Sequence, residues 1–187
     1  MEKEHMSDTS LAVSLPEMLD ARERRLMLQT SLISHFQTTI VCLTLNIPGP
    51  VKVLPGVPQA YEAACRQIEQ LLQAHDIPIL QKTEQKEKTG WEAFYPADTA
   101  PETAKRLMVS LEEQSRFGRL LDIDVLRTDG SKVSREEIGF PPRTCLLCRE
   151  PAHVCSRSRR HTVAELTAEV ERILADHIHD SGKDDAL

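Results

Sequence analysis

The stretch TTIVCLTLNI, from Thr38 to Ile47, decides how the chain folds. Its β-branched and apolar residues predict a buried strand. The strand stops at the loop Asn46-Ile47-Pro48-Gly49-Pro50, whose prolines and glycine make it rigid, and this loop leads to Lys52. The segments before and after the strand alternate between helical and extended patterns.

Helices are expected on both sides of this strand. Ser14-Leu15-Pro16-Glu17 combines a capping box with an early proline, so a helix should begin there and run to about Phe36. Apolar residues line one side of that helix, although its middle is polar. The other expected helices begin after Pro58, at Asp98–Glu102 with a stop near Gly118, at Ser134 as a short turn, and at Thr162 with an end near Ile178.

Three more strands are predicted, at residues 77–85, 90–96 and 120–126, and a hairpin turn follows at 128–130. The middle of the chain then has the order β-α-β-β-α-β, flanked by N- and C-terminal helices. This order predicts an α+β fold with a mixed sheet, a split βαβ layout and helices on one face. We expect a disordered leader at 1–13, a single domain at 14–178 and a flexible tail at 179–187.

The composition limits the class of protein. Of the 187 residues 40% are hydrophobic, which predicts a globular chain. Aromatic residues make up only 4% and the net charge is −6, which argues against partners such as nucleic acid or an anionic membrane. No signal-peptide pattern and no apolar run of bilayer length is present. The odd number of five cysteines favours a reduced, cytoplasmic protein.

Two aspartates alternate with apolar residues in the predicted strand 120–126. Side chains two apart in a strand point to the same face, so Asp122 and Asp124 should lie about 6–7 Å apart on one side. Two carboxylates in one space repel each other unless a cation lies between them, and Mg²⁺ accepts such a pair. Gly118 and Arg119 just upstream offer a close backbone approach and a phosphate-binding guanidinium. The alternative is an edge strand whose polar face is simply hydrated.

The segment 143–161, RTCLLCREPAHVCSRSRRH, concentrates cysteine, histidine and arginine. It carries five arginines and one glutamate, a local charge of +4, so the rest of the chain sums to −10. Its spacing C-x2-C-x6-C-x5-H suits four ligands of a structural Zn²⁺. The alternatives are a redox dithiol and small apolar packing residues. The candidate zinc ligands are Cys145, Cys148, Cys155 and His161.

The same segment is also a candidate anion site. Arg157, Arg159 and Arg160 precede His161 and the start of the last predicted helix. Free N–H groups and the helix dipole favour an anion at a helix N-terminus, and guanidiniums bind phosphate oxygens. The alternative is a solvated basic loop.

Three motifs together resemble one family: Pro48-Gly49-Pro50-Val51-Lys52, Gly118–Val125, and Pro141-Pro142-Arg143-Thr144-Cys145-Leu146-Leu147-Cys148 with the residues that continue to His161. The chain is similar, from about Leu15 to about Leu174, to the apo-citrate lyase phosphoribosyl-dephospho-CoA transferases, also called citrate lyase holo-acyl-carrier-protein synthases. Many nucleotidyltransferases carry Gly-Ser ahead of their paired aspartates, whereas this chain has Gly118-Arg119, so the likeness to that larger class is weaker.

The resemblance implies a reaction and its participants. The family moves a phosphoribosyl-dephospho-CoA group from 2'-(5-triphosphoribosyl)-3'-dephospho-CoA to a serine of the acyl carrier (gamma) subunit of citrate lyase. Pyrophosphate leaves and a phosphodiester forms, so the chemistry is of the nucleotidyltransferase type. The positive segment and the carboxylate pair are compatible with that reaction.

Residue roles follow as expectations. Asp122 and Asp124 would hold Mg²⁺, and Asp124 or a water on the ion would accept the serine proton. Binding of the substrate and its phosphates is assigned to Lys52, Gly118, Arg119, Arg143, Arg157, Arg159 and His161. Two rival readings predict a zinc-stabilised adaptor without catalysis, or an enzyme with Cys155 as nucleophile and His161 as base.

Overall fold

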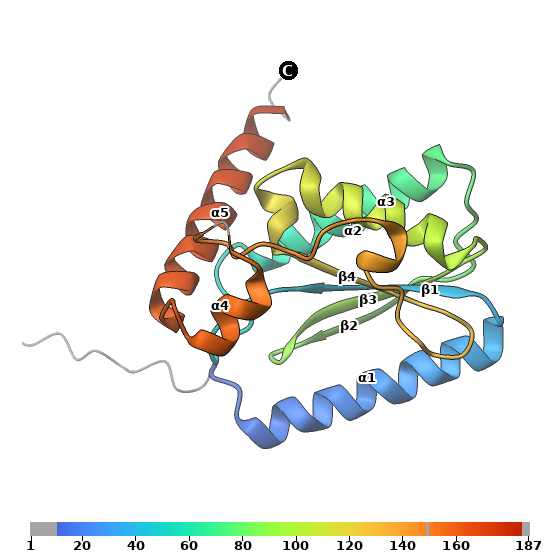
Figure 1. Ribbon diagram of the computed structural model, residues 1–187, viewed down its shortest axis with the longest axis horizontal. Helices are drawn as coiled ribbons and strands as arrows, with labels where there is room; N and C mark the ends of the chain where they lie inside the picture. Colours follow the sequence, from blue (N-terminus) through green and yellow to red (C-terminus); the bar gives the residue numbers. More distant parts are fainter. Residues whose placement is uncertain (1–10, 149, 185–187) are drawn as a thin grey trace, which may run out of the picture.

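A four-stranded sheet forms the centre of the protein, in a computed structural model that describes residues 11–148 and 150–184 (Figure 1). The strands are β1 (Thr39–Leu45), β2 (Thr83–Glu87), β3 (Gly90–Ala97) and β4 (Leu121–Leu126). Their order in the sheet is β2-β3-β1-β4, and each neighbouring pair is antiparallel. The predicted α+β class is confirmed.

The predicted mixed sheet is wrong, and the topology gives the reason. Helix α2 (Val57–Ala74) connects β1 to β2, and these two strands run in the same direction because each is antiparallel to β3. They do not touch, since β3 lies between them. The hairpin partner of β2 thus splits the βαβ unit and leaves no parallel neighbours.

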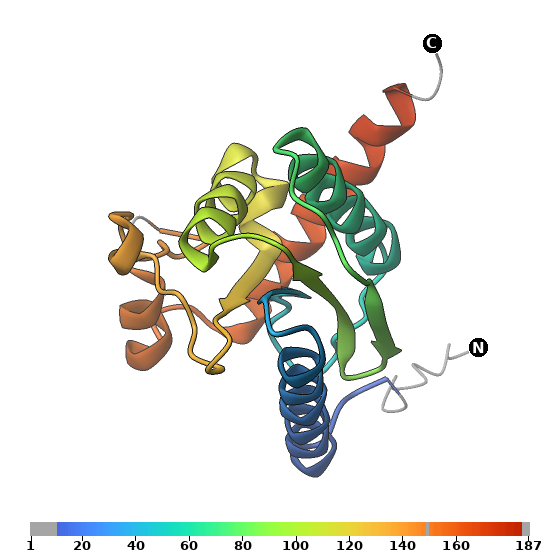
Figure 2. The same ribbon diagram turned by 90° about the vertical axis from the view of Figure 1, so that its right-hand side faces the viewer.

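Helices cover both faces of the sheet, not one face as predicted. On one face lie α2, α3 (Pro101–Gln114) and α5 (Val163–Asp184), and the larger apolar core forms there. On the opposite face lies α1 (Leu15–Phe36), as Figure 2 shows with α1 on the far side of the sheet from α2 and α3. The central strand β1 is accordingly buried from residue 39 to residue 43.

Helix α1 packs on the sheet through its C-terminal half. Its predicted capping box is present, because Ser14 Oγ accepts a hydrogen bond from the Glu17 backbone N–H while the Glu17 carboxylate accepts one from Ser14. A small second core joins this half to the sheet; its members are Leu28, Leu32, Ile33, Phe36, Ile40, Cys42, Phe94 and Leu126. The N-terminal half carries Arg22 and Arg25 instead, and a polar cavity lies between it and the sheet.

Strand β4 is an edge strand whose outer side is closed by α3. Buried Lys105 donates from Nζ to the Ile123 carbonyl at 2.7 Å, and buried Glu112 accepts from the Ile123 N–H at 3.0 Å. Arg135 forms an ion pair with the Glu112 carboxylate. These side chains satisfy the polar backbone atoms that an edge strand would otherwise expose.

Several predicted boundaries shift. Strand β2 begins at Thr83 and not at residue 77, because Ile79 makes only an isolated bridge to Ala97. Helix α5 continues past the expected end near Ile178 to Asp184. The short turn η2 (Glu136–Ile138) forms where predicted, and α4 (Ala152–Ser158) is an additional short helix.

Gly118 has a packing role rather than the predicted helix-stop role. Helix α3 ends at Gln114, and Gly118 lies in the following turn η1 (Phe117–Leu120). A Cβ atom on Gly118 would lie 2.3 Å from the Leu111 carbonyl oxygen, so only glycine fits against the end of α3. Gly118 is buried in this contact. The packing explains why a glycine is needed here without the close approach to a phosphate that the sequence analysis expected.

Parts of the predicted domain limits fall outside the structure. Residues 1–10 of the expected leader and residues 185–187 of the expected tail lie outside the described residues. Val13, still within the expected leader, donates its backbone N–H to the Pro50 carbonyl at 2.9 Å. In the part of the chain that is described, no helix combines the length and the apolar character needed to cross a membrane.

Candidate active site

Strand β4 presents its two aspartates on one face of the sheet, as the alternation predicts. Leu121, Ile123 and Val125 point into the larger core. Asp122 and Asp124 therefore point to the opposite face, the one that α1 partly covers. The side chain of Asp122 is 53% exposed and that of Asp124 is 38% exposed, so both carboxylates can be reached from solvent.

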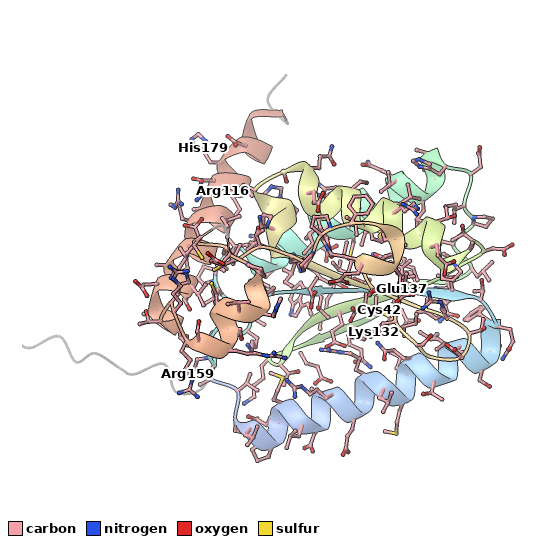
Figure 3. The ribbon with its side chains drawn as sticks, viewed as in Figure 1. Cys42, Arg116, Lys132, Glu137, Arg159 and His179 are labelled. Carbon is pink, nitrogen blue, oxygen red and sulfur yellow. The ribbon has the colours of Figure 1, made fainter. Side chains whose placement is uncertain are left out.

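Each aspartate is balanced by one cation. Lys132 Nζ lies 2.5 Å from Asp124 Oδ2, and Arg143 Nη1 donates to Asp122 Oδ1 at 3.2 Å. Figure 3 shows Lys132 over the sheet beside Cys42, the β1 residue that pairs with Asp124. The sequence analysis missed Lys132, although the predicted hairpin turn was a signal: it brings Lys132 back into a bridge with Leu126.

The two charges on β4 influence each other. The pKa of Asp122 is raised above its ordinary value, first because surrounding groups displace water from the carboxylate and then because Asp124 lies nearby. Arg143 opposes this effect without cancelling it. Both effects disfavour the ionised form of Asp122, so a cation placed between the two carboxylates would stabilise that form.

Arg143 also links β4 to the Cys/His segment. Its Nη2 donates to the carbonyls of Arg119 at 3.0 Å and Leu121 at 2.6 Å. Arg119 in turn donates to the carbonyl of Thr144 at 2.6 Å. Burial lowers the pKa of Arg119, and the neighbouring Arg143 charge adds to this. These two guanidiniums fix the loop that follows Pro142 against the start of β4.

A cavity of about 190 Å³ lies between the N-terminal half of α1 and the sheet. Asp122 lines it, whereas Asp124 is not among its lining residues. Its charged lining residues are Arg22, Arg25, Lys52, Glu92 and Asp122. The predicted residue Lys52 therefore shares a cavity with Asp122; its Nζ donates to the Ile47 carbonyl at 2.7 Å. Burial lowers the pKa of Lys52, and the charge of Arg22 lowers it further.

The cavity contains a buried ion pair that the sequence analysis missed. Arg25 Nε donates to Glu92 Oε1 at 2.9 Å, and the Glu92 side chain is almost fully buried. Among the described groups, Glu92 Oε2 has no hydrogen-bond partner. The polar middle of the first predicted helix was the available signal for Arg22 and Arg25, because these residues interrupt its apolar stripe on the side of the sheet.

A larger cavity of about 770 Å³ adjoins this site. Asn46 lines both cavities, which places them on either side of the end of β1. The predicted binding residues that line the larger one are Arg119, Arg143, Arg159 and His161. Arg157 is exposed and is not among the lining residues, although it lies only two positions from Arg159. Figure 3 shows Arg159 at the end of α4.

The start of α5 is less available to an anion than predicted. Glu165 accepts a hydrogen bond from the Thr162 backbone N–H at 2.7 Å, and Thr162 Oγ1 accepts one from the Glu165 N–H at 3.2 Å. This capping box places a carboxylate at the helix N-terminus, where it uses the dipole itself. Positive charge at the larger cavity therefore comes from arginine side chains and not from the helix end.

The three cysteines of the segment and His161 lie close together. One ligand atom from each of Cys145, Cys148, Cys155 and His161 lies within 4.8 Å of the others, so the cluster could hold a metal ion. The hydrogen bond of His161 Nε2 is to the Cys148 sulfur, at 3.3 Å, and not to Cys155, the partner that the nucleophile hypothesis expects. The Cys148 thiol also raises the pKa of Cys155 to about 12, the opposite of what a nucleophilic thiolate needs.

The chain is similar to known proteins over nearly its whole length. The family model for apo-citrate lyase phosphoribosyl-dephospho-CoA transferase matches residues 13–177. A Vibrio cholerae serotype O1 protein named "Probable apo-citrate lyase phosphoribosyl-dephospho-CoA transferase" is 36% identical over 169 residues, 89% of this chain and 94% of the relative. A Streptococcus pyogenes serotype M18 protein with the same name is 33% identical over 167 residues, 87% of this chain and 86% of the relative.

A longer relative shares the same region. The Haemophilus influenzae protein named "Protein CitXG" is 32% identical over 165 residues, which is 88% of this chain. This chain spans only 36% of the length of that relative.

The raised pKa of Asp122 predicts a stability change with a defined sign. A carboxyl with a raised pKa in the folded state destabilises the fold as pH rises above its ordinary value of 3.8. We expect Asp122→Asn to raise the urea midpoint at pH 7; the corresponding gain in the free energy of unfolding should be less than about 1 kcal/mol, because the side chain is half exposed. The gain should shrink toward pH 4.

Glu17→Gln is the control with the opposite sign. The Lys88 ammonium and Ser14 lower the pKa of Glu17 to about 2, so its charge stabilises the fold above pH 4.5 and this stabilisation is lost as pH falls. Its Gln variant should lower the midpoint at pH 7. An Asp122→Asn midpoint at or below that of the parent protein at pH 7 would show that the Asp122 charge is not under strain.

Proposed function

Because the chain belongs to the apo-citrate lyase phosphoribosyl-dephospho-CoA transferase family, we propose that it attaches the prosthetic group of citrate lyase. The substrate is 2'-(5-triphosphoribosyl)-3'-dephospho-CoA, and the acceptor is a serine of the acyl carrier (gamma) subunit. The observation that supports this most directly is the meeting of two positively lined cavities at Asp122 and Arg143. A polyphosphate attached to a bulky group needs two such compartments.

The transfer is a single displacement at phosphorus, in which one bond forms and one breaks. The serine oxygen forms a bond to the phosphorus nearest the ribose, and the bond from that phosphorus to the terminal pyrophosphate breaks. The serine proton passes to a carboxylate of the site. Asp124, or a water on the bound ion, is the acceptor that the sequence analysis assigned. Asp122 is a second candidate, because its raised pKa makes it a stronger base than an ordinary aspartate.

The residues of β4 fit a magnesium ion. Mg²⁺ binds one or two carboxylates and completes its coordination with water and phosphate oxygens, and Asp122 and Asp124 supply two carboxylates on one face. When bound, the ion would neutralise charge on the leaving pyrophosphate. Lys132 and Arg143 contact these carboxylates now and would pair with phosphate oxygens as the substrate enters.

Each cavity would bind a different part of the substrate. The smaller one holds three cations, Arg22, Arg25 and Lys52, and its volume suits a pyrophosphate. The larger one has the volume of a nucleotide site and carries Arg119, Arg143 and Arg159 toward the remaining phosphates. Catalysis then depends on positioning and on charge stabilisation rather than on a covalent enzyme intermediate. A non-catalytic zinc adaptor is the alternative that the relatives' names do not favour.

The carboxylates should be required for transfer. Purified protein, apo-carrier, precursor and Mg²⁺ are mixed, and the mass of the carrier is followed with time. We expect Asp122→Asn and Asp124→Asn each to lower the transfer rate by about 10²-fold or more, since each removes charge stabilisation at the reacting phosphate. Asp98→Asn, an exposed aspartate at the far end of β3, is the control and should keep the parental rate. Unchanged turnover in both β4 variants would show that these two carboxylates are not needed for the transfer.

Two neighbouring arginines test the larger cavity. Arg159 lines it and Arg157 does not, although both are exposed and both lie at the end of α4. Arg159→Gln should raise the KM for the precursor about tenfold, because one charged hydrogen bond is lost. Arg157→Gln should change the KM by less than about twofold. Equal effects would mean that the basic segment acts only through its total charge.

A further inference from the structure

The Cys/His cluster borders the larger cavity but takes no part in the displacement at phosphorus, and it joins three segments of the chain that follow β4. Cys145 and Cys148 come from the loop after Pro142, Cys155 from α4, and His161 from the link between α4 and α5. Cys145 and Cys155 are buried, and Cys148 and His161 are half-buried. We propose that these four side chains hold one structural Zn²⁺.

The spacing of the ligand atoms fits a shared ion better than packed thiols. The sulfurs of Cys148 and Cys155 are 3.3 Å apart, and His161 Nε2 is 3.3 Å from the Cys148 sulfur. A tetrahedral zinc with Zn–S bonds of about 2.3 Å places its sulfurs roughly 3.8 Å apart. A disulfide would need about 2.05 Å, and all five cysteines are free. Four soft ligands converge on one point here, and no carboxylate is part of the group.

The segment has too small an apolar core to explain its fold without a metal. Between residues 143 and 161, with residue 149 outside the description, the only buried hydrophobic residues are Cys145 and Cys155. Leu147 and Val154 are exposed. Backbone bonds define a tight loop, because Cys145 donates to the Glu150 carbonyl at 2.7 Å. A metal supplies the folding free energy that such small segments lack.

The proposed zinc would also hold in place Arg119 and Arg143, two guanidiniums that line the larger cavity. Arg143 lies two residues before Cys145, and the carbonyls of Thr144 and Cys145 accept hydrogen bonds from Arg119. Three of the four ligands, Cys145, Cys155 and His161, line the larger cavity. The metal would therefore fix the wall that carries Arg143 to Asp122. Only this consequence for catalysis rests on the proposed function; the metal site itself does not.

The first test is metal content. The full chain is purified under reducing conditions without added metal, and zinc per chain is measured by elemental mass spectrometry. We expect one zinc per chain. After chelation, added Co²⁺ should give the visible absorption bands of a tetrahedral site together with a thiolate charge-transfer band in the near ultraviolet. Less than about 0.1 zinc per chain, together with no thiolate–cobalt band, would overturn the proposal.

Matched variants locate the site. Cys148→Ser should lower zinc at least tenfold, because it removes a ligand, whereas Cys42→Ala, a buried cysteine of β1 outside the cluster, should keep one zinc per chain. If Cys148→Ser fails to fold, the cobalt spectrum of the parent chain and its loss on alkylation of the cluster thiols serve in its place. Full zinc in Cys148→Ser, or an octahedral cobalt spectrum in the parent, would contradict the assignment.

The zinc measurement and the transfer assay can succeed or fail independently of each other. If the parent chain holds zinc but does not modify the carrier, the metal site stands and the proposed function fails. If the chain modifies the carrier and holds no zinc, the reverse is true.

Discussion

The pairing of β4 with β1 is the constraint on which the candidate active site depends. In this register Asp122 lies opposite Thr44 and Asp124 lies opposite Cys42, on the face that α1 partly covers. A shift by one residue would turn both carboxylates into the core beneath α2 and α3, where their charges would be unpaired. Lys105 and Glu112 oppose such a shift, because both bind the backbone of Ile123 from α3.

The second requirement is that a basic loop reaches the same face from beyond the sheet. Arg143 brings this loop to the sheet, because it contacts Asp122 and the backbone carbonyls at the start of β4. The loop has few apolar contacts of its own, so its position depends on Arg119 and on the Cys/His cluster. Helix α1 completes the enclosure with Arg22 and Arg25, where an ordinary amphipathic helix would have placed apolar residues.

Local patterns predicted much of this arrangement. Alternation along 120–126 placed Asp122 and Asp124 on one face, and the cysteine spacing identified a group of ligands that meet in space. Non-local pairing could not be read in the same way: the antiparallel strand order depends on β3 entering between β1 and β2. Glu92 of β3 was missed for this reason, whereas Lys132 was within reach of the predicted hairpin turn. The capping box at Thr162 was visible in the sequence, yet its carboxylate competes with the anion expected at the same helix end.

We infer that the carboxylates of β4 and the arginines of both cavities act on a single polyphosphate. The most direct test of this inference is an anomalous diffraction measurement on crystals of the protein soaked with Mn²⁺ and inorganic triphosphate. We expect a manganese peak in contact with Asp122 and Asp124, with phosphate density extending toward Arg143. A manganese peak remote from β4, or triphosphate bound without contact to Arg143 or the cations beneath α1, would contradict it.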